Sequence, residues 1–292
     1  MISIAVASNN NYAILMAVLI KSIVFNHHTD EDITFYVLND KISSSNQDKI
    51  NSLIKNSPEI TIKWINADSV FPKNVKFPMD NSAFPFTAYL RLFAPFVVEE
   101  SVKKLIYFDV DMVVRKDVSE LWNMNMQGYT MAAVLDVGKT AGTPWGGIPN
   151  YKQLGIDANA KYFNSGMMII DCEKWRNENI PEMVFKAMRD NIEHVNFADQ
   201  YGLNVVFTGK WLAIDPLWNW FANIYHPNPK CIHYLDIKPI FKSYNSDIVL
   251  QKEFFKYLEM TPWKGISLKS DFSRLLGKAI IKFKKKFISL VS

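Results

Sequence analysis

The first third of the chain alternates short β-branched runs with helical segments, and this alternation restricts the fold more than any other feature of the sequence. The runs ISIAVAS, ITFYVLN and ITIKWIN occupy residues 2–8, 33–39 and 60–66. The segments between them, 12–25 and 44–55, have helical character. This order of strands and helices predicts a parallel sheet with helices on both faces. Right-handed crossovers in such a sheet place ligands at the carboxyl ends of the strands.

The rest of the chain supplies further strands and helices, with no internal repeat and no low-complexity linker. We expect strands over 103–115, 130–136, 162–171 and within 230–239, and helices over 86–96 (stopped by Pro95), 173–178, 181–194, 199–207 and 249–260. Two segments are expected to be loops: 138–150, rich in Gly, Pro and Thr, and 216–230, which is aromatic. The sequence therefore predicts one compact α/β domain over residues 1–268 and a tail over 269–292.

The composition and the N-terminal sequence indicate in which cellular compartment the protein is expected. The 292 residues are 49% hydrophobic, which is ample for a core. Cys172 and Cys231 are the only cysteines and form no CxxC pair, so we expect neither a disulfide framework nor a structural zinc site. The start, MISIAVASNN, has no basic n-region, and the apolar run 13–20 is shorter than the ~20 residues that cross a bilayer. These features favour a protein of the reducing cytoplasm.

Residues 105–114, LIYFDVDMVV, place two carboxylates in an otherwise apolar strand. Asp109 and Asp111 are two residues apart, so on a strand both side chains point to one face. Unpaired burial of two carboxylates is strongly unfavourable, and a hard divalent cation would bind both. The chain has neither of the glycine-rich loops, GxGxxG or GxxxxGK[ST], that bind phosphates in many nucleotide-binding proteins. A bound phosphate would therefore need another positively charged group, such as a divalent cation, to neutralise it. The alternative is pairing with basic side chains: Arg91, Arg115 or Lys116.

The run YFDVDMVVRKDVSELW (107–122) resembles the metal-binding signature of family 8 glycosyltransferases. Seven other segments resemble that family in the same order: VASNNNYA (6–13), TAYLRLFAP (87–95), AAVLD (132–136), YFNSGMMIIDCEKWR (162–176), ADQYGLNVVF (198–207), CIHYLDIKP (231–239) and FFKYLEMTPWK (254–264). In character the chain is similar to bacterial lipooligosaccharide and lipopolysaccharide galactosyl- and glucosyltransferases. The resemblance covers roughly residues 2–264.

The resemblance implies a GT-A fold, in which a Rossmann-like nucleotide-binding half and an acceptor-binding half share one mixed central sheet. It also implies a retaining enzyme that uses a UDP-sugar and a divalent metal, Mn²⁺ or Mg²⁺. Asp109, Asp111 and His233 would be the metal ligands, and the cation would bridge the diphosphate. Lys238 would add a second positive charge. As a single residue, His233 would rather be read as a core histidine, and Lys238 as a surface lysine.

The remaining site residues also follow from the resemblance. Gln200 and Asp199 would be catalytic, and Asp136 would lie toward the acceptor. The nucleotide and donor sugar would be bound by Ala7, Asn9, Asn11, Tyr12, Arg91, Asp109, Val110, Asp111, Asn164, Ser165, Gly166 and Lys238.

Several of these residues have simpler structural roles as alternatives. Asn9 and its neighbours could cap the helix that follows, as could Asp199, and Gly166 could mark a bulge. Two positions depart from the family pattern. Asn9 stands where the family often has an aspartate. Asp236 stands where it frequently has a glycine near the phosphates, and a carboxylate there would repel them unless it is turned away or paired.

Retention of configuration by double displacement needs a carboxylate nucleophile. The residue in the expected position is Gln200, whose amide is a poor nucleophile. We therefore favour a front-face route, in which the acceptor hydroxyl attacks on the side from which UDP departs and a phosphate oxygen takes its proton.

The tail over 269–292 has seven basic residues and one acidic residue, whereas the whole chain has a net charge of +4. Its apolar residues recur at helical spacing: Phe272, Leu275, Leu276, Ala279, Ile280, Phe283 and Phe287. Basic residues populate another face: Arg274, Lys278, Lys282 and Lys285. This pattern predicts a basic amphipathic helix on an anionic membrane surface, which would make the protein peripheral on the inner face of the cytoplasmic membrane. A helix packed on the body and a partner-binding segment are the alternatives.

These features favour a retaining, metal-dependent hexosyltransferase that acts on a cell-envelope glycan, whether a saccharide or a lipid-linked glycan. A protein- or self-glycosylating transferase is the second interpretation, and a non-enzymatic nucleotide-sugar binding module is the third. Because the body is nearly neutral and has no basic stripe, we do not expect nucleic acid to be a partner.

Overall fold

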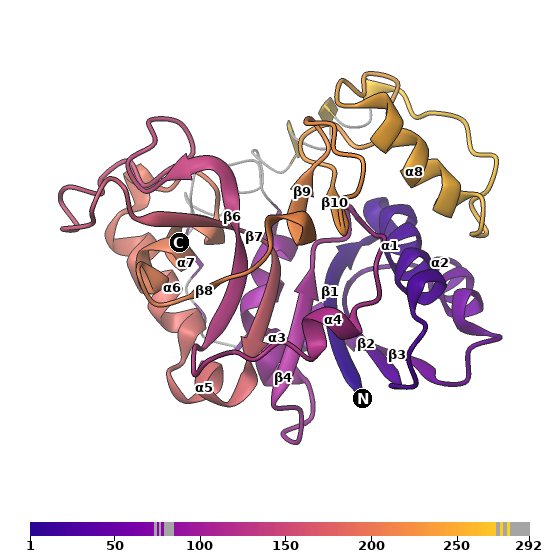
Figure 1. Cartoon of the computed structure of the whole chain (residues 1–292), viewed down its shortest axis with the longest axis horizontal. Coiled ribbons are helices and arrows are strands. Elements are labelled where there is room, and N and C mark those ends of the chain that lie inside the picture. Colours follow the sequence, from indigo (N-terminus) through magenta and orange to yellow (C-terminus); the bar gives the residue numbers. More distant parts are fainter. Residues whose placement is uncertain (73–74, 76, 79–84, 273–274, 277–278, 281–292) are drawn as a thin grey trace.

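A seven-stranded mixed sheet forms the centre of the molecule, with helices on both faces (Figure 1). The computed structural model describes residues 1–72, 75, 77, 78, 85–272, 275, 276, 279 and 280. The strand order in the large sheet is β3-β2-β1-β4-β7-β6-β8. Its strands are β1 (Ile2–Asn9), β2 (Ile33–Asp40), β3 (Ile60–Asn66), β4 (Lys104–Phe108), β6 (Met131–Thr140), β7 (Lys161–Asp171) and β8 (Leu212–Ala213).

The first four strands of this sheet are parallel, as the alternation of strands and helices predicts. β7 runs antiparallel to both β4 and β6, whereas β8 pairs parallel with β6. A second, three-stranded sheet has the order β5-β10-β9 and contains β5 (Met112–Val114), β9 (Trp220–Phe221) and β10 (Cys231–His233). The seven-stranded sheet is therefore mixed, and its parallel half is made of the four strands nearest the N-terminus, β1 to β4.

The helices of the described residues are α1 (Ala13–Asn26), α2 (Ser44–Asn51), α3 (Leu90–Val97), α4 (Ser119–Trp122), α5 (Cys172–Asn177), α6 (Ile180–Asp190), α7 (Asp199–Phe207) and α8 (Ile248–Leu258). Short 3₁₀ turns are η1 (Asn10–Tyr12), η2 (Ser52–Ile54), η3 (Ala67–Ser69), η4 (Phe86–Tyr89), η5 (Ile192–His194) and η6 (Pro216–Asn219). None of the described helices is both long enough and apolar enough to cross a bilayer.

The two faces of the sheet bury two separate apolar cores. Along β1, Ile4 and Val6 belong to the core that also contains α1 and α8, whereas Ala5 and Ala7 belong to the core beneath α3, α6 and α7. Successive residues of a strand point to opposite faces. A strand that is buried on both faces therefore has apolar residues at successive positions, which explains the predominantly apolar sequences of β1, β2 and β4.

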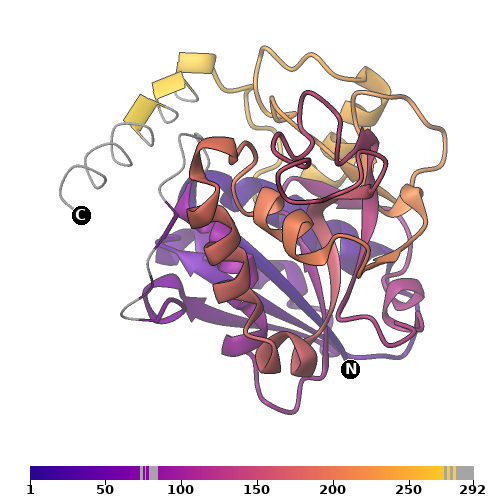
Figure 2. The same cartoon turned by 90° about the vertical axis from the view of Figure 1, so that its left-hand side faces the viewer.

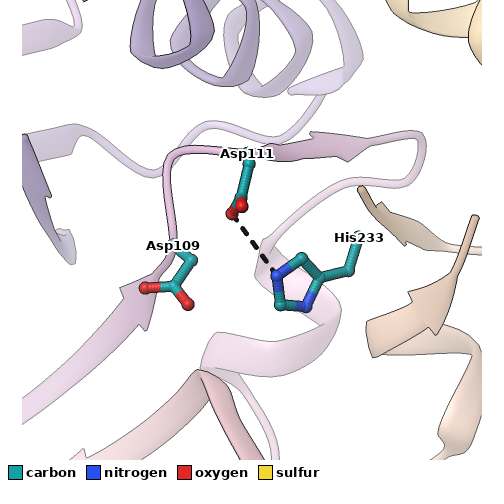
Figure 3. A group of neighbouring side chains, drawn as sticks. All are labelled: Asp109, Asp111 and His233. Atoms are coloured by element: carbon teal, nitrogen blue, oxygen red, sulfur yellow. Dashed lines mark ion pairs between the residues drawn. The ribbon is translucent and has the colours of Figure 1, made fainter. Parts of the chain in front are cut away.

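The expected strand over 103–115 is wrong in one respect, because it breaks at the two aspartates. β4 ends at Phe108, residues 109–111 turn, and β5 joins the second sheet. The amide of Asp109 donates to the carbonyl of Gly166 at 2.7 Å, and the carbonyl of Asp111 accepts from the amide of Tyr234 at 3.0 Å. The chain thus passes from one sheet to the other at Asp109–Asp111, where the Asp111 carboxylate points toward His233 and the Asp109 carboxylate lies nearby (Figure 3).

The expectation that Pro95 stops a helix is also wrong. α3 continues through Pro95 to Val97, although proline cannot donate a helical hydrogen bond. Side chains supply donors to this turn, because Trp175 Nε1 donates to the carbonyl of Leu92 at 2.8 Å and Arg176 Nε donates to that of Pro95. The tertiary contacts of α5 therefore hold a turn that local sequence disfavours.

Both expected loops contain regular structure. β6 extends to Thr140, which pairs with Lys161 after an irregularity in register. The aromatic segment 216–230 contains η6 and β9, and β9 pairs parallel with β10. The expected helix over 181–194 ends earlier, at Asp190, and is followed by η5.

Candidate active site

Asp109, Asp111 and His233 converge at the point where the two sheets meet (Figure 3). One ligand atom from each of the three lies within 4.8 Å of the others, and His233 Nε2 is 3.3 Å from Asp111 Oδ1. The aspartates come from the turn between β4 and β5, and His233 comes from the end of β10. Two carboxylates and one imidazole are ligands that suit Mn²⁺ and are tolerated by Mg²⁺.

Gly166 leaves the space in which this cluster fits. A Cβ at this position would lie 2.5 Å from His233 Cε1, 2.9 Å from Asn164 Oδ1 and 3.0 Å from Asp109 Oδ2. The amide of Gly166 donates to Asn164 Oδ1 at 3.0 Å. The residues present therefore fit a divalent cation, because the donor set is hard and the backbone opposite it carries no side chain.

Each aspartate also has a basic partner. Lys238 Nζ lies 2.5 Å from Asp111 Oδ2 and donates to the carbonyl of Tyr234 at 2.8 Å. Burial acts to raise the pKa of Asp111, but the charges of Lys238 and His233 outweigh it and hold this pKa well below its usual value. Asp111 is therefore ionised, as a metal ligand must be.

Arg91 is buried and joins two carboxylates. Its Nη1 lies 3.1 Å from Asp109 Oδ1, and its Nε lies 3.1 Å from Asp199 Oδ2. Nη1 also donates to the carbonyl of Ser165 at 2.9 Å. Burial acts to lower the pKa of Arg91, but Asp109 and Asp199 outweigh it and raise this pKa above its usual value. The ion pair that the sequence offers as the alternative for Arg91 is thus present.

Of the other two basic residues considered from the sequence, Arg115 pairs with Glu253 at 3.3 Å. Lys116 is exposed. Lys238, which the family resemblance singles out, provides the positive charge at Asp111.

Gln200 lies in α7, and both ends of its side-chain amide are hydrogen-bonded. Its Oε1 accepts from the amide of Ser165 at 3.0 Å and from Asn164 Nδ2 at 3.2 Å. Its Nε2 donates to Tyr162 Oη at 3.3 Å and to Asp136 Oδ2 at 3.4 Å. The side chain is only 7% exposed, so its orientation is fixed by these four contacts.

Asp199 precedes Gln200 as the first residue of α7, and its carboxylate pairs with Arg91. The N-cap position of α7 is Ala198, so Asp199 is the first residue of the helix and not its N-cap. Ala198 has φ +47°, a left-handed value that costs energy for a residue with a side chain. The strained turn brings Asp199 and Gln200 into the site together.

Asp136 is buried at 3% exposure in the middle of β6, and burial raises its pKa despite Lys139 Nζ at 3.4 Å. A cavity of about 600 Å³ opens beside it. The cavity is lined by Leu135, Asp136, Val137, Gly138, Lys139, Thr140, Asn159, Lys161, Pro216 and Trp220. Asp136, one of the lining residues, accepts a hydrogen bond from Gln200.

The residues that follow β1 lie at the same edge of the sheet as the residues that follow β4, because β1 and β4 are adjacent and parallel. Asn9 Oδ1 accepts from the amide of Asn11 at 3.0 Å, so Asn9 does cap the turn that follows. Tyr12 is partly buried against the core, and Ala7 is buried.

Asp236 adopts φ +53°, the left-handed conformation that glycine takes most easily. Its side chain is exposed. The loop before Lys238 therefore has a backbone suited to glycine, with the carboxylate of Asp236 turned outward.

Sequence reasoning missed Asn219, Tyr162 and Lys139. Asn219 is fully buried between the metal cluster and Asn164. The only sequence signal for it is an asparagine between two tryptophans, in a segment that precedes the histidine strand. Its partners are distant in sequence, so the pattern alone could not show its contacts.

A family model described as glycosyl transferase family 8 matches residues 3–242. General stress protein A of Bacillus subtilis (strain 168) is 27% identical over 89% of this chain and 93% of its own length. Lipopolysaccharide 1,2-glucosyltransferase of Escherichia coli (strain K12) is 28% identical over 99% of this chain and 85% of its own length. The solved structure of galactosyltransferase LgtC with donor and acceptor sugar analogues covers 89% of this chain and 96% of that one, with a TM-score of 0.72 and 22% identity, and shows a shared fold.

Proposed function

Because the chain belongs to glycosyltransferase family 8 and has its GT-A fold, we propose that it is a retaining enzyme that transfers galactose or glucose from a UDP-sugar to a saccharide acceptor. The acceptor we propose is a cell-envelope glycan such as lipopolysaccharide or lipooligosaccharide, in line with the Escherichia coli relative, a lipopolysaccharide 1,2-glucosyltransferase. The observation that carries the proposal is the continuous set of contacts from the Asp109–Asp111–His233 cluster to Gln200 and Asp136.

We assign the cation to Asp109, Asp111 and His233. When bound, Mn²⁺ or Mg²⁺ would offset the negative charge that develops on the departing UDP. Lys238 adds a positive charge on the same side, at Asp111. Arg91 holds the carboxylates of Asp109 and Asp199 in fixed positions, so neither has to reorganise when the donor binds.

The donor-binding roles remain a proposal for the following residues: Ala7, Asn9, Asn11, Tyr12, Arg91, Asp109, Val110, Asp111, Asn164, Ser165, Gly166 and Lys238. Asn9 and Asn11 keep polar atoms at the end of β1, where a nucleoside would lie in a sheet of this kind. The outward carboxylate of Asp236 leaves the backbone near Lys238 free to approach a diphosphate.

We propose front-face attack for the transfer step. Gln200 has an amide that is a poor nucleophile, and its oxygen already accepts from Ser165 and Asn164. Asp199 is held in an ion pair with Arg91. The acceptor hydroxyl would therefore attack on the side from which UDP departs, and a phosphate oxygen would take its proton. A glycosyl adduct trapped on Asp199 and detected by mass spectrometry would contradict this route.

The donor and the enzyme class are tested by a donor screen with Mn²⁺ that measures UDP release. We expect release from UDP-galactose or UDP-glucose, and its loss in Asp111→Asn. Absence of release from both, and from the N-acetylhexosamine donors, would contradict the proposal in favour of a binding module. A protein acceptor in place of a glycan would instead appear as sugar attached to protein, including the chain itself.

We propose that the tail places the enzyme on the inner face of the cytoplasmic membrane. The described tail residues 271, 272, 275, 276, 279 and 280 are helical and lie at the periphery of the molecule (Figure 2). Phe272 is 74% exposed and Leu275 is 56% exposed, so an apolar surface faces outward. The other residues of the amphipathic pattern lie outside the described residues: Arg274, Lys278, Lys282, Phe283, Lys285 and Phe287. Buried free thiols at Cys172 and Cys231 suit a reducing compartment.

A further inference from the structure

We propose that Asn219 is a positioning residue that sets the tautomer of His233 and joins the metal cluster to Gln200, an inference that rests on the proposed function. Asn219 is the last residue of η6 and has 0% exposure. Its Oδ1 lies 2.9 Å from His233 Nδ1, and its Nδ2 donates to Asn164 Oδ1 at 2.9 Å. Asn219 thus links His233 directly to Asn164.

The direction of every amide in this network follows from one backbone group. The amide of Gly166 can only donate, and it donates to Asn164 Oδ1 at 3.0 Å. Asn164 Nδ2 must then face Gln200 Oε1, at 3.2 Å. Because Asn164 presents its oxygen to Asn219, Asn219 must present Nδ2 in return. The remaining end of Asn219, which faces His233, is its oxygen.

An amide oxygen only accepts, so His233 Nδ1 must carry a proton. A neutral imidazole has one proton, and Nε2 therefore keeps its lone pair on the side of Asp111. This is the form that a metal ligand requires. Without Asn219, the proton would be drawn to Nε2, where Asp111 Oδ1 is an acceptor 3.3 Å away.

The same network fixes Gln200. Since its oxygen accepts from Asn164 and from the amide of Ser165, its Nε2 must face Asp136 and Tyr162. Asn219 therefore acts on both parts of the site: directly on His233, and through Asn164 on Gln200. Groups that orient a metal-bound histidine typically affect metal affinity by about 10–100-fold.

Two substitutions separate these two effects. Asn219→Asp keeps an oxygen toward His233 but removes the donor to Asn164. Asn219→Leu has a similar size and removes both contacts. Asn150→Leu is the matched control, because Asn150 is also buried and loses two side-chain bonds, to Asn191 and Tyr201, in the core away from the cluster.

The first measurement is the ¹⁵N spectrum of histidine side chains in the metal-free full chain, recorded at rising pH until the His233 ring is neutral. The chain has five histidines, and His233→Gln assigns the signal. We expect the Nδ1–H form in the wild type, in Asn219→Asp and in Asn150→Leu, and the Nε2–H form in Asn219→Leu. An Nε2–H form in the wild type would overturn the inference even if Asn219→Leu did not fold.

The second measurement is the affinity for Mn²⁺ in the presence of UDP, from the electron paramagnetic resonance signal of the free ion. We expect a loss of about 10–100-fold in Asn219→Leu, and little change in Asn219→Asp and Asn150→Leu. Asn219→Asp should instead lower kcat while leaving Mn²⁺ affinity intact, because only its link toward Gln200 is broken. Equal loss of affinity in both Asn219 variants would overturn the tautomer role. A chain that gives the expected spectra and binds Mn²⁺ but releases no UDP would contradict the proposed function alone.

Discussion

Gly166 shows how the absence of one side chain shapes the site. A Cβ there would meet His233, Asn164 and Asp109 at 2.5–3.0 Å. We expect Gly166→Ala to displace the imidazole and lower Mn²⁺ affinity in the presence of UDP by about 5- to 150-fold, because overpacking of this kind costs about 1–3 kcal/mol. Calorimetric titration of Mn²⁺ into the protein with UDP measures the change.

Gly202→Ala is the matched control for this substitution. A Cβ on Gly202 would meet Val184 and Met188 at 2.8–2.9 Å, in the contact between α6 and α7. It should lower the melting temperature without changing Mn²⁺ affinity. If the two variants lost affinity equally, the effect of Gly166→Ala would be a general loss of packing.

Asp236 offers a gain-of-affinity prediction. Its φ of +53° favours glycine, and its carboxylate adds a negative charge beside the loop that carries Lys238. We expect Asp236→Gly to relieve the backbone strain and to strengthen UDP binding about two- to tenfold, with a smaller gain at high salt. Titration of UDP at two ionic strengths measures this, and weaker binding by Asp236→Gly would contradict it.

For single residues, the sequence could predict a place in the site where the residue belongs to a recognisable local motif. Asp109 and Asp111 lie two residues apart, and His233 stands in a recognisable segment, so their convergence could be expected. Asn219 could not be found in this way. Its role depends on Asn164 and His233, which reach it from two other strands.

The break between β4 and β5 shows, for secondary-structure elements, that contacts between distant parts of the chain could not be predicted from local sequence. Residues 105–114 read as one apolar strand, and the two aspartates between 105–108 and 112–114 do not by themselves show that the strand ends there. What divides them is the partner of each half. β4 pairs with β1 and β7, whereas β5 pairs with β10, more than a hundred residues later in the chain. Periodicity reports burial and carries no information on which sheet a strand joins.

Asp117 connects the residues after α1 to the start of α4, and it gives a pH prediction. It accepts from the amides of His28 at 2.6 Å and Ser119 at 2.9 Å, and from His27. Burial acts to raise its pKa, but these bonds outweigh it and lower this pKa from 3.8 to about 2. The ionised carboxylate therefore stabilises the folded state above about pH 4, and that stability is lost as the pH falls toward 2.

We expect Asp117→Asn to lower the free energy of unfolding by about 1–2 kcal/mol at pH 7, allowing for solvent screening of a partly exposed group. The difference from the wild type should shrink steadily between about pH 4 and pH 2. Urea unfolding at a series of pH values checks this. A difference that stayed constant down to pH 2 would mean that the charge of Asp117 does not contribute.

The loop after β6 carries an exposed aromatic surface beside the cavity at Asp136. Trp145 is 74% exposed and lies edge-to-face with Phe197 at 5.5 Å, and Lys139 Nζ is 4.9 Å from the Trp145 ring. We expect Trp145→Ala to raise the KM for simple β-galactoside or β-glucoside acceptors roughly tenfold, through loss of stacking. Hydrolysis of the UDP-sugar without acceptor should be unchanged.

Initial rates over a range of acceptor concentrations measure this effect. Phe25→Ala is the control, because Phe25 is a 46%-exposed aromatic residue on α1 that contacts Tyr257. An equal rise in KM for both variants, or a fall in hydrolysis by Trp145→Ala, would contradict a role for Trp145 in the acceptor site.

For the molecule as a whole, the sequence predicted the parallel half of the sheet and the position of the site at its carboxyl edge. The mixed character came from the family resemblance, because the direction of β7 is not visible in its composition. A long loop connects β6 to β7, and β7 runs antiparallel to both of its neighbours, β4 and β6. The reversal brings Asn164, Ser165 and Gly166 to the end of β4, next to Asp109.

The boundary between body and tail decides how the membrane proposal is tested. Lys269 still belongs to the body, since its amide donates to the carbonyl of Ile240 at 2.8 Å and its carbonyl accepts from Lys242. Asp271 accepts from Ser243 Oγ. Deletion of 273–292 therefore removes the tail beyond these contacts and preserves them, whereas deletion from 269 would also disturb the body.

We expect the full chain to sediment with vesicles that contain about 30% anionic lipid and to be released by high salt, because the attraction is screened within about 10 Å at 0.1 M salt. The chain without 273–292 should remain in the supernatant at every salt concentration and should hydrolyse the UDP-sugar at the wild-type rate. Lys282→Glu with Lys285→Glu should weaken sedimentation, whereas Lys55→Glu with Lys103→Glu, on the body, should not. Sedimentation that survives the deletion would place membrane binding on the body, and a helix that packs on the body would then be the better account of the tail.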